Sequence, residues 1–200
     1  VDSESRIENI KCFGWYHSTD GVGLEENSTL KNSFLKVNDD AVKLYRSGIR
    51  VYNCVIWQQQ NGAPFQFSWN HRGENRDVLV RSCDLIHVEH TKPARNRAIF
   101  SGVMISNLHQ RDFVFEDIRI EGDVYRLFDF RLGDRGSLSN LLFRNIEVAG
   151  MIRDGSYFRG QDGVVENVRF DNLRVNGKQI RDAADLTILT QAQVDGLNFD

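Results

Sequence analysis

The chain has 200 residues, a formal net charge of −3 at pH 7, an isoelectric point near 6.0 and 40% hydrophobic residues. This length and composition allow one buried core and exclude a disordered segment or a disulfide-dominated miniprotein. Its 25 Lys and Arg residues are interspersed among 28 Asp and Glu residues, so we expect no nucleic-acid partner. No apolar run approaches the ~20 residues of a membrane span, so we expect no membrane contact.

A six-residue pattern recurs seven times along the chain. Its first and last residues are apolar, its third residue is polar, its fourth is apolar or small, and its second and fifth vary. Val, Ile and Phe dominate each unit, and turn residues follow it, which indicates short strands. Strands that recur with one polar residue at the same phase predict an all-β right-handed parallel β-helix of about seven to eight coils. We expect the central residues to stack as a hydrogen-bonded ladder. They are 21 to 35 residues apart: Asn9, Asn32, Asn53, Ser82, Asp117, Asn145 and Asn172.

The repeat extends along the whole chain, so we expect residues 1–200 to form a single β-helix domain. The segment from Lys178 to Gln193 departs from the strand pattern and predicts a long loop or a short helix, and the repeat resumes at Val194. Cys54 and Cys83 follow ladder positions and are expected in the core. Neither end carries an obvious cap, which predicts end-to-end self-association through exposed strand edges.

Three aspartates occupy related positions in two successive coils. Asp20 lies within Thr19-Asp20-Gly21, and Asp39 and Asp40 follow nineteen and twenty residues later within Asn38-Asp39-Asp40. Because the two segments lie one coil apart, the three carboxylates should converge on one face of the helix. Repulsion between their charges should raise the pKa of at least one of them. Such a cluster suits glycoside hydrolysis, in which one carboxylic acid protonates the leaving oxygen and another carboxylate activates water.

The segments Thr19-Asp20-Gly21 and Asn38-Asp39-Asp40-Ala41-Val42-Lys43, with the aromatic coil that follows, resemble the pectin-lyase-like β-helix hydrolases, and within them glycoside hydrolase family 49, the dextranases and isopullulanase. The resemblance covers about residues 9–73. It implies an inverting, secreted hydrolase of α-glucan polysaccharides that needs no cofactor or metal, with Asp39 as general acid and Asp20 and Asp40 activating water. Relative to the family, the chain is expected to be truncated on its N-terminal side.

Several side chains near the acids are candidates for substrate binding. Trp15 and Trp69 are predicted to stack on sugar rings, and Gln66 and His17 to bond sugar hydroxyls. Phe65 and Phe67 alternate with Gln66 and are expected in the core. Lys43 and Arg72 would bind an acidic sugar, although a surface ion pair is the simpler expectation for them.

Two alternatives follow from the same residues. A polygalacturonase-like hydrolase of a uronide would be expected to carry Gly-His-Gly and Arg-Ile-Lys tripeptides, and the chain contains neither. A non-catalytic carbohydrate-binding β-helix fragment would bind sugar without turnover, and its aspartates would be dispensable.

Overall fold

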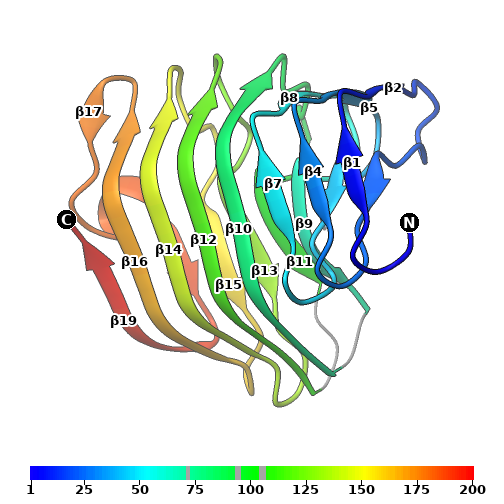
Figure 1. The fold of residues 1–200 in the computed structure, drawn as a ribbon. Coiled ribbons are helices and arrows are strands. Elements are labelled where there is room, and N and C mark those ends of the chain that lie inside the picture. The colour runs from blue at the N-terminus through cyan, green and yellow to red at the C-terminus, as the bar shows by residue number, and fades with distance from the viewer. Residues whose placement is uncertain (71–72, 93–95, 104–106) are drawn as a thin grey trace.

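The computed structural model describes residues 1–70, 73–92, 96–103 and 107–200. Its strands stack coil on coil, almost all of them in parallel, which confirms the predicted right-handed parallel β-helix (Figure 1). The larger of its two sheets follows the repeat seen in the sequence. It contains β1 (Arg6–Glu8), β2 (Lys11–Phe13), β4 (Thr29–Lys31), β5 (Phe34–Val37), β7 (Arg50–Tyr52), β8 (Val55–Gln58), β10 (Gly73–Ile86), β12 (Leu108–Ile120), β14 (Ser137–Val148), β16 (Val164–Val175), β17 (Lys178–Gln179) and β19 (Gln193–Phe199).

The second sheet forms the opposite wall of the helix and positions the candidate site. All of its strands pair in parallel, so side chains at equivalent positions form rows along the helix axis. Its strands, in chain order, are β3 (Val22–Gly23), β6 (Val42–Lys43), β9 (Phe65–Trp69), β11 (Phe100–Val103), β13 (Phe128–Arg131), β15 (Ser156–Arg159) and β18 (Ile188–Thr190).

The predicted polar ladder lies at a bend in each coil. All seven of its residues have a left-handed backbone, with φ between 50° and 58°. Asn and Asp tolerate this conformation because their short polar side chains bond locally. Asn145 links two neighbouring coils, donating to Asp117 Oδ1 at 2.9 Å and accepting from Asn172 Nδ2 at 3.0 Å. The ladder thus bends the chain and joins the coils.

A second left-handed ladder lies five residues before the first and was not predicted. Its members vary in type, which hid the pattern in the sequence. Asn140 donates to Asp112 Oδ1 at 2.9 Å and accepts from Asn167 Nδ2 at 2.8 Å. The long strands β10, β12, β14 and β16 therefore bend twice each. The ladder consists of Glu4, Asn27, Gly48, Asp77, Asp112, Asn140, Asn167 and Gly196, with φ from 51° to 75°.

Stacked phenylalanines fill the space between the two sheets. Phe65, Phe100 and Phe128 occupy one row of the second sheet, with ring centroids 5.6 and 5.4 Å apart along the row. Each buried phenylalanine contributes roughly 1.5–3 kcal/mol through removal of apolar surface from water. Phe65 and Phe67 are fully buried, as expected, and Cys54 and Cys83 also lie in the core.

The segment from Lys178 to Gln193 contains β17, a short 3-10 helix (Ala184–Leu186) and β18, and β19 then rejoins the repeat beside β16. The expected departure and return of the repeat are both present. Across the described ranges, no helix is long and apolar enough to cross a membrane.

Candidate active site

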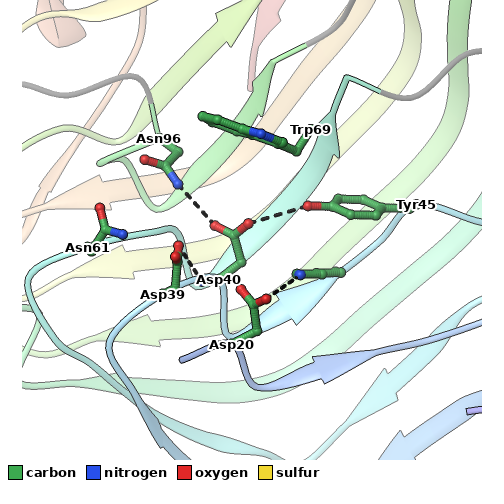
Figure 2. Close-up of a pocket in the computed structure, with 8 residues that line it drawn as sticks. Asp20, Asp39, Asp40, Tyr45, Asn61, Trp69 and Asn96 are labelled. Carbon is green, nitrogen blue, oxygen red and sulfur yellow. Dashed lines mark hydrogen bonds and ion pairs between the residues drawn. The ribbon is translucent and has the colours of Figure 1, made fainter. Parts of the chain in front are cut away.

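Asp20, Asp39 and Asp40 come together where two successive coils enter the second sheet. Asp20 lies just before β3, and the Asp39-Asp40 pair lies just before β6, which pairs with β3. The backbone N–H of Asp39 donates to the carbonyl of Thr19 at 2.9 Å, and Gly21 N–H donates to Asp40 O at 2.9 Å. One oxygen of each carboxylate lies within 4.8 Å of the other two (Figure 2). The stacked turns therefore place three acids in one cluster.

Asp40 is the most buried member of the cluster, with 5% of its surface exposed. Its Oδ1 accepts from the backbone N–H of Ala63 at 3.1 Å and from Asn96 Nδ2 at 3.3 Å, and its Oδ2 accepts from the Tyr45 hydroxyl at 3.3 Å. Burial, and then the charge of Asp39, raise the pKa of Asp40 to about 7. This carboxyl is therefore held rigidly and titrates near neutral pH.

Asp39 is only partly buried, and its Oδ1 accepts the backbone N–H of Asp40 at 3.1 Å. Burial first, and then the charge of Asp20, raise its pKa above the ordinary value for aspartate. The hydrogen bond from the Asp40 backbone, and then the positive charge of Lys43, oppose this rise in pKa. Because like charges lie side by side, the cluster retains a proton at a pH where isolated aspartates have lost theirs.

Asp20 is the most accessible of the three acids and is paired with a lysine. Lys43 Nζ lies 2.5 Å from Asp20 Oδ2, and the Asp20 side chain is 42% exposed. The three carboxylates offer oxygen ligands of the kind that a divalent cation takes. The Lys43 ammonium already supplies a positive charge at Asp20, so the cluster carries an internal counter-ion.

Residues of the following coil contact the backbone of Asp39 and Asp40. Gln58 Nε2 donates to the backbone carbonyl of Asp39 at 3.1 Å and to that of Asn61 at 2.5 Å. Gly62 has φ +69°, and a Cβ at this position would lie 2.2 Å from the carbonyl carbon of Asp39. Only glycine allows this close approach of the two backbones.

The acids line a cavity of about 440 Å³ that opens to the surface. Trp69, at the end of β9, forms part of its wall and is 40% exposed. Figure 2 shows the indole beside Asp40 and Tyr45. The complete lining is Asp20, Asp39, Asp40, Lys43, Tyr45, Asn61, Trp69 and Asn96.

Three of the predicted substrate contacts lie outside this lining. Trp15 is 63% exposed and stacks on Phe13, with centroids 6.0 Å apart. The backbone carbonyl of His17 accepts from Asn61 Nδ2 at 3.1 Å, and the ring lies near enough to Asp39 to act on its charge. Gln66 points away from Phe65 and Phe67 as expected, but its side chain is fully buried. Their roles in binding stay predictions, and Arg72 lies outside the described residues.

Three residues of the cavity could have been found from the sequence only in part. Tyr45 lies two residues after Lys43 and faces Asp40, as alternation along the strand could have indicated. Asn61 lies just before Gly62, whose positive φ marks a turn. Asn96 is 56 residues from Asp40 in the chain, on the segment between β10 and β11, and no repeat phase marks it.

A parallel β-helix that gathers three carboxylates in a surface cavity is the arrangement that the sequence resemblance led us to expect. No family model matches the chain. Among curated proteins, it is 42% identical over 82 residues to a dextranase of Arthrobacter sp. (strain CB-8), 26% over 160 residues to the isopullulanase of Aspergillus niger and 31% over 102 residues to a dextranase of Talaromyces minioluteus. These matches cover 40%, 72% and 50% of this chain.

These relatives confirm the resemblance to the dextranase and isopullulanase family, glycoside hydrolase family 49. The matched regions span 13%, 28% and 16% of the three relatives. Among solved structures, Dex49A from Penicillium minioluteum superposes with a TM-score of 0.73 at 18% identity, over 88% of this chain and 35% of that one. The structural likeness establishes the shared β-helix fold.

Proposed function

We propose that this chain carries the catalytic acids of a glycoside hydrolase that cuts α-linked glucan, with dextran as the expected substrate. The observation that supports this most strongly is the convergence of Asp20, Asp39 and Asp40 in one open cavity, two of them with raised pKa values. The dextranase and isopullulanase relatives support the substrate class. A polymer of this kind is met outside the cell, so we also propose that the parent protein is secreted.

Asp39 is assigned as the general acid. Its carboxyl faces the cavity, and its raised pKa keeps a proton available for the leaving oxygen. The proton passes to the glycosidic oxygen as the bond from the anomeric carbon to that oxygen breaks. Water attacks the anomeric carbon, and its proton passes to Asp40 or Asp20. The products are two sugar chains, with one proton moved from acid to base.

Asp40 suits the activation of water better than direct attack on sugar. Both of its oxygens are hydrogen-bonded and only 5% of the residue is exposed, so its carboxylate cannot approach an anomeric carbon closely. Because its pKa is about 7, Asp40 accepts the proton of water only where it is ionised, near and above neutral pH, and there it is a stronger base than an ordinary aspartate. The limited access to Asp40 favours inversion, whereas carboxylate oxygens within 4.8 Å of one another are nearer the ~5–5.5 Å separation of retaining enzymes than the ~6.5–9.5 Å of inverting ones. The anomer released first decides between them.

The uronide alternative has less support. Lys43 is already paired with Asp20, so it is not a free cation for a sugar carboxylate. The cavity itself is lined by three acids, which would repel a uronate.

A panel of polysaccharides tests the proposal. Reducing-end release by this chain is measured on dextran, pullulan, an α-1,3-glucan and polygalacturonate. Release from an α-glucan alone is expected, and release from polygalacturonate alone would replace the proposal with the uronide reading. Absence of release on all four would overturn catalysis by this chain. Sugar titration by calorimetry would then test the binding-only reading.

Proton NMR of the freshly released reducing end tests the stereochemistry. Inversion predicts that the β-anomer appears first. Initial appearance of the α-anomer would mean retention and would assign direct attack to the accessible Asp20.

A further inference from the structure

Three arginines surround one buried carboxylate on the outer face of the second sheet. Asp129 in β13 is fully buried, and its Oδ2 accepts from Arg126 Nη1 at 2.9 Å and from Arg131 Nη2 at 3.2 Å. Arg159 Nε lies 3.5 Å from Asp129 Oδ1 without forming a hydrogen bond. Burial of such a charged group stabilises a fold little, if at all, because desolvation offsets the attraction. The cluster therefore invites a functional explanation.

The arrangement leaves buried hydrogen-bonding capacity unused. Asp129 Oδ1 and the Nε atoms of Arg131 and Arg159 are buried without a hydrogen-bond partner. Native structures leave few such groups, and each one requires an explanation. Arg131 is held by its hydrogen bond to Asp129, and Arg159 lies beside Asp129 as an ion pair.

Arg131 and Arg159 lie in the same row of the second sheet as Trp69, which lines the acid cavity. Trp69 in β9 pairs with Val103 in β11, Val103 pairs with Arg131 in β13, and Arg131 pairs with Arg159 in β15. Figure 1 shows β9, β11, β13 and β15 following one another along the second sheet. Three strand spacings of ~4.8 Å place Arg159 about 14 Å from Trp69 along the helix axis. A linear ligand that leaves the acid cavity along this row reaches Arg131 and Arg159.

The exposed surface of the cluster combines donors with an aromatic ring. The side chains of Arg131 and Arg159 are each 30% exposed, and the Arg159 guanidinium lies 3.6 Å from the centroid of the Tyr157 ring. Within the described ranges, neither terminal nitrogen of Arg159 makes a hydrogen bond. The guanidinium N–H groups can donate to the hydroxyl oxygens of a neutral sugar, and the neighbouring aromatic ring offers apolar contact surface.

We propose that Arg131, Tyr157 and Arg159 form a distal sugar-binding site that holds a glucan chain several units from the scissile bond. This inference rests on the proposed function. A neutral sugar fits better than an anion because each arginine of the cluster already faces a carboxylate, Asp129 for all three and Asp154 for Arg126. The site makes binding depend on chain length, because a disaccharide beside the acids does not reach it.

Calorimetric binding to an Asp39→Asn chain, which prevents turnover, tests this site. Isomaltooctaose and isomaltose are titrated into this chain, into the same chain with Arg159→Ala, and into a control with Arg181→Ala, an exposed arginine outside the row. Arg159→Ala is expected to weaken isomaltooctaose binding about tenfold, the effect of losing one or two hydrogen bonds to a charged group. Isomaltose binding, and both affinities of the control, are expected to stay unchanged.

The other outcomes separate this site from the proposed function. Equal weakening of both ligands by Arg159→Ala would indicate a merely structural role and overturn the distal site. Equal affinities of the Asp39→Asn chain for both ligands, or no effect of Arg159→Ala, would overturn the site and leave the proposed function standing. Absence of binding to either ligand would overturn both.

Discussion

Replacement of Gly62 by alanine should destabilise the protein and displace the Asp39-Asp40 pair. Gly62 has φ +69°, and an added Cβ would lie 2.2 Å from the carbonyl carbon of Asp39 and 2.4 Å from the backbone nitrogen of Asp40. The left-handed conformation costs a residue with a Cβ about 1–2 kcal/mol. Relief of the clash requires a backbone shift that costs about 1–3 kcal/mol more. We therefore expect a loss of about 2–5 kcal/mol in the free energy of unfolding.

Two other glycines separate the cost of the left-handed backbone from the cost of the steric clash. Gly122 has φ +73° with open space around its Cβ position, so Gly122→Ala should lose only about 1–2 kcal/mol. Gly23 has neither a positive φ nor a neighbour within 4 Å, so Gly23→Ala should change stability by less than about 0.5 kcal/mol. Urea unfolding of the three variants measures the differences, and in a chain of this size each 1 kcal/mol corresponds to roughly 2–4 °C in Tm. If Gly62→Ala is no worse than Gly122→Ala, the close approach to the Asp39-Asp40 backbone is refuted.

Three further predictions follow from the site and the ladder. Folded Asp40 keeps its proton up to about pH 7, whereas the unfolded chain releases it near pH 3.8, so the free energy of unfolding should fall as pH rises between these values. Urea unfolding at several pH values should show a smaller fall for Asp40→Asn. The same pH dependence in the variant and the unmodified chain would contradict the raised pKa. Asn145→Ala should lose about 2–3 kcal/mol through two hydrogen bonds and a strained φ of 52°, and Asn145→Gly should lose less in the same unfolding assay. Trp69→Ala should weaken oligosaccharide binding several-fold in calorimetry without altering Tm, and an unchanged affinity would exclude the indole from the sugar site.

The fold could be predicted because one bend of each coil is formed mostly by asparagine. Asn9, Asn32 and Asn53 are separated by nearly constant intervals, and the left-handed backbone of each explains why asparagine recurs. The second ladder includes Gly48 and Asp77 at equivalent positions. Glycine adopts this conformation because it has no Cβ, and aspartate adopts it because its short polar side chain bonds locally. The shared backbone geometry is therefore not visible in the sequence as one recurring residue type.

The acid cluster was predictable for the same reason, since residues at one phase of successive coils must stack. Its surroundings were less predictable. Asn96 reaches Asp40 from a segment 56 residues further along, and Gln66 is fully buried although it alternates with the core residues Phe65 and Phe67. Alternation along a strand indicates the direction of a side chain but not what covers it. The ion pair expected for Lys43 is present, and its partner, Asp20, belongs to the preceding coil.

The most direct test of the account compares dextran hydrolysis by the unmodified chain, by Asp39→Asn and by Asp162→Asn, in which an exposed turn aspartate outside the cavity is changed. The account predicts that Asp39→Asn lowers the initial rate of reducing-end release by at least about a hundredfold, the usual contribution of a general acid. Asp162→Asn should retain the rate of the unmodified chain. Full activity of Asp39→Asn, with its Tm unchanged, would contradict the assignment of the catalytic acid.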